Sequence, residues 1–365
     1  MTNKTDTPRK PRATRKPRKS RGPRKDWYQV ITDNFVQAIE GVLDGSRPCL
    51  PWRKPWKGGR SATGVGGFGD FNPVSGTVYK GINILLLAIA RAEHDFDSLE
   101  WGTFKQWKKA GGFVAKGSKG TQIVFWKPTL VTVKDDDGNV VLDDKGKPKL
   151  RKSFFLRVSS VFNRDQVEGL KEEVVVEVVE EEVEEEEELA QHAVAEAVLD
   201  GSGASISWDS PGRAFYRPSS DEIHLPPRQD FTSVEGLYGT ALHELVHWTG
   251  HHSRVAEVHP RHGDDARTKG GFFGSEDYAA EELVAEFGAA FLCAATGVVA
   301  ATEVRDDHVS YLRSWLKALK DDKRAIFTAT SRAQDACTYL LAKAGIEVPG
   351  KVEVEETTQD EEQAA

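Results

Sequence analysis

The chain has 365 residues, of which 39% are hydrophobic and 29% are charged. This length predicts about two domains rather than one small core. The best apolar run, residues 82–90, falls short of the roughly 18 residues of a membrane span, and no secretory signal is visible, so we expect no membrane partner and a cytoplasmic location. The three cysteines, Cys49, Cys293 and Cys337, are too scattered to suggest a disulfide framework or a thiolate metal site.

Charge divides the chain into two halves. Residues 1–170 carry 32 Lys and Arg against 17 Asp and Glu, whereas residues 171–365 carry 17 against 40. Segment 1–25, with eleven cations and recurrent proline, predicts a disordered basic tail that attracts nucleic-acid phosphates or, alternatively, only aids solubility. Segment 171–189, with eleven glutamates, predicts a solvated linker, and a mimic of DNA phosphates is the alternative. Residues 348–365 predict a disordered acidic tail.

Residues 26–170 form the first predicted domain, a helix followed by a meander of strands. Asp26 has N-cap character ahead of an apolar repeat with helical spacing, and Gly45 can end that helix. The stretch GINILLLAIA (81–90) predicts a buried helix, and WGTFKQWKKAGG (101–112) predicts a short amphipathic helix. The stretch FVAKGSKGTQIVFWKP (113–128) predicts a hairpin, and two further strands flank DDDGN. Together these elements indicate an α+β unit.

Cations alternate with aromatic side chains throughout this first domain. Lysines can follow a phosphate backbone while exposed rings stack on bases, each stack being worth about 1–3 kcal/mol. Core packing is the competing interpretation, so we expect two or three of the rings to be exposed. The pattern predicts single-stranded DNA binding by a set of rings and lysines: Trp56, Tyr79, Lys80, Trp101, Lys105, Trp107, Lys116, Lys119 and Lys127.

The second predicted domain, residues 190–347, contains a helix with metal-ligand spacing. Ser233 can cap a helix through GLYGTALHELVHWTG (236–250). On it His243 and His247 lie four residues apart on one face and can present two imidazole nitrogens to one ion. Glu244 completes the HExxH pattern, in which the glutamate is the general base of a zinc peptidase. The longer pattern HExxHxxGxxH fails, because Ser253 occupies the position of the third histidine.

A third ligand is expected from SEDYAAEELVAEFGAAFLCAATG (275–297), which predicts a helix. Glu282 and Glu286 lie four residues apart on one face of this largely apolar helix, and two such carboxylates would be costly without a cation. We expect Glu286 to hold one of the imidazoles from behind, and Glu281 is the alternative ligand. The predicted zinc ligands are His243, His247 and Glu282.

Several segments carry a family resemblance when they are taken in order. They are YKGINILLL, TFKQWKKAGGFVAKGSKGTQIVFW and VFNRDQVEGL in the first half, and IHLPPRQDF, ALHELVHWTGH and FGSEDYAAEELVAEFGAAFL in the second. The chain resembles the ArdC-type antirestriction proteins of plasmids and phages. That resemblance implies a single-stranded DNA-binding domain shared with TraC-type primases, joined to a zincin-like, mainly helical metallopeptidase domain. It also implies protection of entering DNA against host restriction.

We therefore expect a two-domain α+β protein that binds single-stranded DNA and hydrolyses a peptide bond with Zn²⁺. The protein substrate is unknown, and host restriction components are candidates. His308 and Tyr311 are candidates for stabilising the oxyanion, with helix packing as their competing role. Two alternatives stay open: a non-catalytic protein that coats single strands and uses zinc structurally, and a primase accessory factor.

Overall fold

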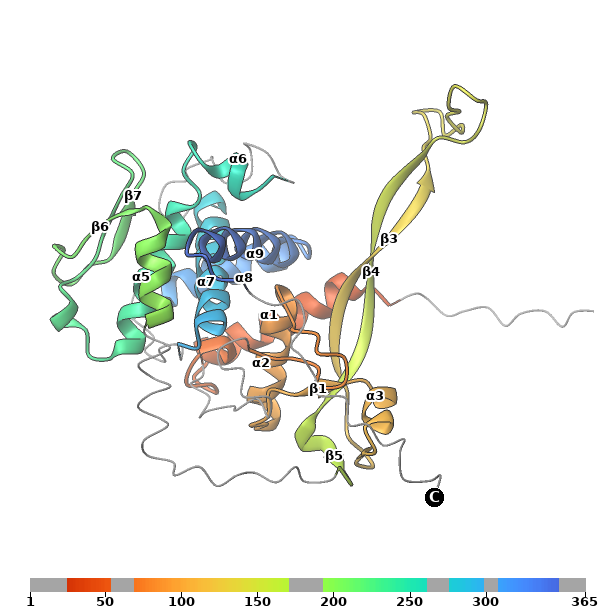
Figure 1. Ribbon diagram of the computed structural model, residues 1–365, viewed down its shortest axis with the longest axis horizontal. Helices are drawn as coiled ribbons and strands as arrows, with labels where there is room; N and C mark the ends of the chain where they lie inside the picture. The colour runs from red at the N-terminus through yellow and green to blue at the C-terminus, as the bar shows by residue number, and fades with distance from the viewer. Residues whose placement is uncertain (1–24, 54–68, 171–192, 261–275, 299–307, 348–365) are drawn as a thin grey trace, which may run out of the picture.

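The computed structural model describes residues 25–53, 69–170, 193–260, 276–298 and 308–347 (Figure 1). Apart from Lys25, the basic segment, the acidic segment and the C-terminal tail lie outside these residues, so what composition indicates about them stays a prediction. Within the described part the chain is mixed α and β, as expected. None of the helices described there combines the length and apolarity of a bilayer span.

The first region builds helices and one long β-arm. Asp26 caps α1 (Trp27–Leu43) as predicted, because its carboxylate accepts hydrogen bonds from the backbone N–H groups of Tyr28 and Gln29. Helix α3 begins at a capping box made by Thr103 and Gln106. The other elements here are η1 (Pro51–Arg53), α2 (Ile82–His94), β1 (Trp101–Gly102), α3 (Phe104–Lys109), β2 (Phe113–Val114), β3 (Thr121–Thr132), β4 (Leu150–Asn163), η2 (Arg164–Gln166) and β5 (Val167–Glu168).

Strand β3 pairs with β4 and not with β2, so the predicted hairpin over residues 113–128 is wrong. The β3–β4 ladder runs from Thr121 opposite Val161 to Thr132 opposite Leu150, and β1 lies on the other side of β4. Strand β2 instead pairs antiparallel with β5. A short hairpin would pair few residues, whereas the ladder with β4 pairs every residue of β3 and so forms more backbone hydrogen bonds. The two strands project from the body as an arm (Figure 1).

The second region is mainly helical. Residues 193–202 are helical, and a small sheet of order β6-β8-β7 follows. Ser233 caps α5 as predicted, accepting from the N–H of Gly236 at 3.0 Å. The elements are β6 (Ser205–Ser207), β7 (Phe215–Arg217), β8 (Glu222–His224), η3 (Arg228–Asp230), α5 (Val234–Trp248), α6 (Val255–Val258), α7 (Glu276–Thr296), α8 (His308–Asp321) and α9 (Ala325–Lys343).

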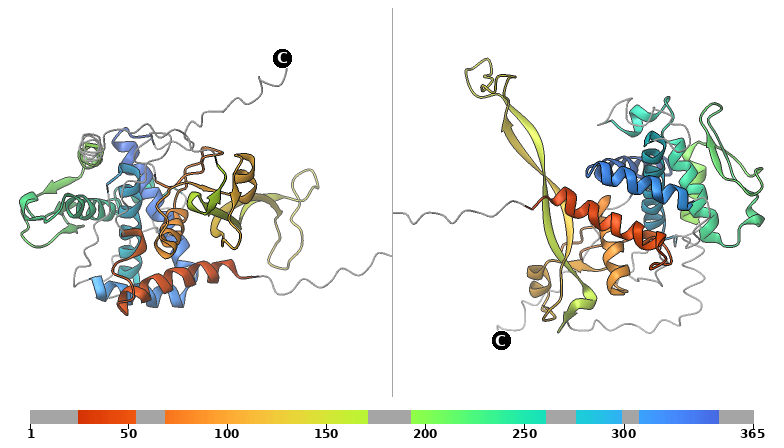
Figure 2. Two further views of the ribbon diagram at one scale, coloured as in Figure 1. Left: turned by 90° about the horizontal axis from the view of Figure 1, so that it is seen from below. Right: turned by 180° about the vertical axis from the view of Figure 1, so that it is seen from behind.

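The two regions share one hydrophobic core. The ring of Phe35 on α1 lies 6.2 Å from that of Phe287 on α7, and the ring of Trp52 lies 5.6 Å from the same phenylalanine. Helix α1 runs alongside the C-terminal helices (Figure 2), where the Thr32 hydroxyl donates to the carbonyl of Lys323 at 2.9 Å. One continuous cluster of buried side chains includes residues of both regions. The apolar stripe of α1, which we assigned to the first domain, therefore faces the second.

A glycine controls how closely α5 and α7 approach. A Cβ built on Gly288 of α7 would lie 2.7 Å from both Cγ atoms of Val246 on α5. Val246 is fully buried, and a β-branched side chain in a helix has essentially one rotamer. The two helices can therefore pack this tightly only because residue 288 has no side chain. This contact lies six residues beyond Glu282 and holds that part of α7 against α5.

Candidate functional site

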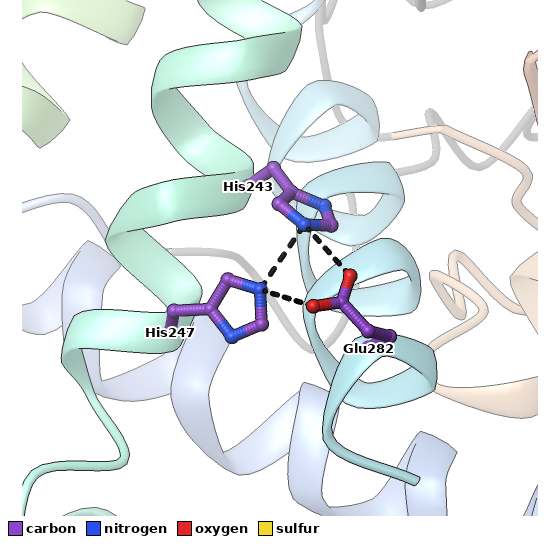
Figure 3. A group of neighbouring side chains, drawn as sticks. All are labelled: His243, His247 and Glu282. Atoms are coloured by element: carbon purple, nitrogen blue, oxygen red, sulfur yellow. Dashed lines mark hydrogen bonds and ion pairs between the residues drawn. The ribbon is translucent and has the colours of Figure 1, made fainter. Parts of the chain in front are cut away.

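His243, His247 and Glu282 meet between α5 and α7 (Figure 3). The Nε2 atoms of the two histidines lie 3.2 Å apart. The Glu282 carboxylate faces both of them, with one oxygen 3.5 Å from the Nε2 of His243 and the other 3.5 Å from the Nε2 of His247. The two imidazoles come from successive turns of α5, and the carboxylate comes from the facing turn of α7. The sequence pattern predicted this grouping, and the structure brings all three side chains together.

The spacing of these atoms fits one small divalent ion. Ligand atoms about 2.0–2.1 Å from a tetrahedral ion lie roughly 3.3 Å from one another. The distances of 3.2 and 3.5 Å match that value without any movement of the helices. Two imidazole nitrogens at this separation also need a proton or a cation between them, because two facing lone pairs would repel each other. The three residues therefore form a divalent-metal site that leaves one coordination position of a tetrahedral ion open.

Burial and charge act in opposite directions on these groups. Burial alone would lower the pKa of His247, but the Glu282 charge and the hydrogen bond with Glu281 outweigh it and raise that pKa to about 10. Burial would raise the pKa of Glu282, yet the two imidazoles hold it well below its usual range. The carboxylate is therefore ionised, and an incoming divalent ion must displace a proton from His247.

The carboxylate that supports an imidazole is Glu281 and not Glu286. The Nδ1 of His247 lies 3.2 Å from a carboxylate oxygen of Glu281, which orients the ring so that Nε2 faces the site. Glu286 instead accepts a hydrogen bond from the indole N–H of Trp52 at 3.1 Å and forms an ion pair with Arg53. Our prediction for Glu286 fails because η1 of the first region packs against this turn of α7. No local sequence pattern signals a contact between residues so far apart in the chain.

Two further groups lie close to the ligands. Glu244 is buried on α5 next to His243, and its charge acts on His247. Tyr278, one turn before Glu282, hydrogen-bonds to Glu282, and its hydroxyl lies 3.1 Å from that of Tyr311. Tyr311 is a candidate from sequence, whereas Tyr278 is not, although its spacing of four residues from Glu282 is a usable signal. The side chain of His308 lies outside the described residues.

The residues predicted to bind DNA fall into two groups. The lysines are exposed: Lys80, Lys105, Lys116, Lys119 and Lys127. The rings of Tyr79, Trp101 and Trp107 are buried, with exposures of 8%, 0% and 2%, and the indoles donate to Asp70 and to the carbonyl of Phe162. These three rings belong to the core and cannot stack on bases, so their assignment is corrected. Trp56 lies outside the described part of the chain.

Comparison with known proteins matches both regions to families. Residues 25–162 match the N-terminal domain of the anti-restriction factor ArdC, and residues 193–332 match a zincin-like metallopeptidase family. Two Escherichia coli proteins named DNA primase TraC are 35% and 37% identical to the chain over 87% of its length. The chain spans 20% and 27% of the length of these two relatives. An uncharacterized protein of Sinorhizobium fredii is 32% identical, with 87% of this chain and 92% of that protein aligned.

Two crystal structures of the antirestriction ArdC protein from the R388 plasmid resemble the whole fold. The metal-free one has a TM-score of 0.60 at 32% identity and covers 89% of this chain and 100% of that one. The Mn(II)-bound one has a TM-score of 0.59 at 33% identity and covers 88% and 98%.

The HExxH helix, the facing glutamate and the ArdC-like first region define a class of protein in which a zincin-like metallopeptidase domain follows an antirestriction domain. The matches extend over nearly all of the described chain and, for the plasmid protein, over its whole length. The chain belongs to the ArdC family of antirestriction proteins, which is related to the TraC primases.

Proposed function

We propose that this chain is a zinc-dependent peptidase that also binds single-stranded DNA and protects entering DNA against restriction in the cytoplasm of a bacterial host. The observation that supports the peptidase is the convergence of His243, His247 and Glu282 beside the buried carboxylate of Glu244. The exposed lysines of the first region support DNA binding. The protein substrate is unidentified, and host restriction components are the candidates.

When bound at this site, a divalent ion would polarise the scissile carbonyl and lower the pKa of a water molecule toward neutrality. Glu244 accepts the proton of that attacking water and returns it to the leaving amine. Glu281 keeps the ring of His247 in the orientation that presents Nε2 to the site. Tyr278, which hydrogen-bonds to Glu282, and Tyr311, whose hydroxyl lies 3.1 Å from that of Tyr278, are the candidate oxyanion donors.

Zinc is the ion we expect, because two imidazoles and one carboxylate with an open position form a common ligand set of catalytic zinc. The plasmid relative binds Mn(II) in one of its crystal structures. Elemental analysis of protein purified without added metal tests the choice, and a preparation that carries manganese or iron at one equivalent and no zinc would contradict it.

Glu244→Gln separates peptide hydrolysis from metal binding. The ligands survive in this variant while the base is lost, so metal content should equal that of the wild type and cleavage of fluorescein-labelled casein should fall by about a hundredfold or more. His243→Ala should lose both the metal and the cleavage. Wild-type activity in Glu244→Gln would contradict the role of Glu244.

A binding protein without peptidase activity is the second candidate, favoured by the core that the two regions share. In that case the metal serves to stabilise the second region, and coated single strands escape restriction directly. Transfer of unmodified DNA into a restricting host distinguishes the two. Glu244→Gln should abolish protection if hydrolysis is the working activity, and should retain it if coating is.

A further inference from the structure

The β3–β4 arm presents two chemically different faces. Residues directly opposite one another in an antiparallel ladder point to the same side, and successive residues point to opposite sides. One side, the mixed face, carries rings and cations together with smaller side chains: Phe125, Lys127, Thr129, Val131, Arg151, Ser153, Phe155 and Arg157. The other side, the apolar face, is mostly hydrophobic: Trp126, Pro128, Leu130, Lys152, Phe154 and Leu156.

Rings and cations face each other across the ladder on the mixed face. Phe125 lies opposite Arg157, and Lys127 lies opposite Phe155. The two phenylalanines are 49% and 45% exposed, and all the cations of this face are exposed as well. Neither strand contains an Asp or Glu, so no carboxylate on the ladder opposes an approaching phosphate. Large exposed rings gathered on one surface indicate a binding site rather than a core.

The apolar face has other contacts. Near the body, Trp126 lies 6.4 Å from the rings of Tyr28 on α1 and Phe327 on α9. Further out, the ammonium of Lys152 lies 5.6 Å over the ring of Phe154, so the cation on this side is already in contact with that ring. The mixed face offers three cations and two rings that can meet a ligand directly.

We propose that the mixed face of the β3–β4 arm is the surface on which this protein binds single-stranded DNA. Its rings stack on unpaired bases, and Lys127, Arg151 and Arg157 pair with phosphates. Bases within a duplex are already stacked on one another, so such a surface selects single strands. The inference rests on the proposed single-strand binding and assigns it to a surface. The stacking rings are then Phe125 and Phe155 in place of the buried Tyr79, Trp101 and Trp107. Lys127 remains from the set predicted from sequence.

The arm contains its own matched controls, because adjacent residues of the same kind point to opposite faces. Phe155 and Phe154 are neighbours with exposures of 45% and 56%, and Arg151 and Lys152 are neighbouring exposed cations. Phe155→Ala and Arg151→Glu change the mixed face. Phe154→Ala and Lys152→Glu change the apolar face with the same removal of a ring and the same reversal of charge. None of the four side chains is buried, so far-UV circular dichroism and metal content should match the wild type in all of them.

Binding is measured by fluorescence anisotropy of fluorescein-labelled oligothymidine with the full-length protein at several salt concentrations. Phe155→Ala and Arg151→Glu should each weaken binding about tenfold, whereas Phe154→Ala and Lys152→Glu should stay within about twofold of the wild type. Arg151→Glu should also reduce the slope of log affinity against log salt concentration by about 0.7 for each phosphate that the variant no longer neutralises.

Four outcomes would overturn the assignment. If variants of the two faces weakened DNA binding equally, the effect would come from the loss of charge or exposed ring in general and not from one face. If all four variants kept wild-type affinity, the DNA would bind elsewhere. If Phe155→Ala and Arg151→Glu failed to bind anionic phosphatidylserine vesicles but kept their affinity for the oligonucleotide, the mixed face would be a membrane surface. Failure of the wild-type protein to bind oligothymidine would reject the single-strand function itself, which the other three outcomes leave standing.

Discussion

Glu281 and Glu282 are adjacent in sequence, yet they contact different atoms of the same imidazole. Glu282 faces the Nε2 of His247, and Glu281 faces its Nδ1. Successive residues of a helix point about 100° apart, so the two carboxylates reach opposite edges of a ring lying between α5 and α7. The contact of Glu281 with Nδ1 fixes the tautomer and orientation of the ring, and the carboxylate of Glu282 completes the metal site.

Glu281→Ala should therefore weaken metal binding about tenfold or more, because His247 loses the group that orients it. Glu281→Gln keeps an acceptor at the same place and should weaken binding less. Competition with a chelator of known affinity measures both variants. Equal affinity in wild type and Glu281→Ala would show that α5 alone orients the ring.

At this scale the sequence predicts the histidine pair and Glu282, because all three follow from local spacing on two helices. It does not predict that Glu286 binds Trp52 and Arg53, since these residues meet only once the two regions have packed. The buried state of Trp101 and Trp107 is hidden for a similar reason. A ring beside lysines looks the same in sequence whether it packs inward or outward.

At the scale of elements, the metal site depends on how closely α5 and α7 approach at Gly288. Gly288→Ala would place a methyl group 2.7 Å from both Cγ atoms of a rigid, buried valine, so the helices must separate locally. We expect a decrease of about 1–3 kcal/mol in the free energy of unfolding and weaker metal binding, because Glu282 moves away from the histidines. Thermal unfolding and chelator competition measure the two effects.

Gly239→Ala on α5 is the matched control, because no atom lies within 4 Å of a Cβ built there. This substitution should be neutral or should stabilise the helix by up to about 1 kcal/mol. Similar behaviour of the two variants would mean that the approach of the helices does not control the site.

The sequence predicts where helices begin better than it predicts which strands pair. Asp26 and Ser233 are helix N-caps as predicted, and residues 82–94 are helical as the apolar run indicates. The partner predicted for β3 is wrong, because residues 150–163, which lie further along the chain, pair with β3 in place of the nearby β2. Local turn residues could not reveal that the distant strand offers the longer ladder.

At the scale of the whole molecule, the shared core predicts that both regions unfold together. Phe35 is fully buried against Trp52 and Phe287, so Phe35→Ala should lower the free energy of unfolding by about 3–5 kcal/mol. Calorimetry should show one transition that shifts as a whole, and bound metal should move the same transition. Phe154→Ala, on the exposed arm, should leave it unchanged. Two separate transitions, with only one shifted by Phe35→Ala, would contradict a common core.

The contact of Trp52 and Arg53 with Glu286 has a consequence for recombination. A chimera that joins the first half of one homologue to the second half of another can place a mismatched pair of side chains around a carboxylate on the helix that supplies a metal ligand. Such hybrids should accumulate as insoluble or metal-poor protein unless the two parents carry matching side chains at these three positions. Exchange of the projecting ribbon beyond residue 125, which leaves this junction intact, should be tolerated far better.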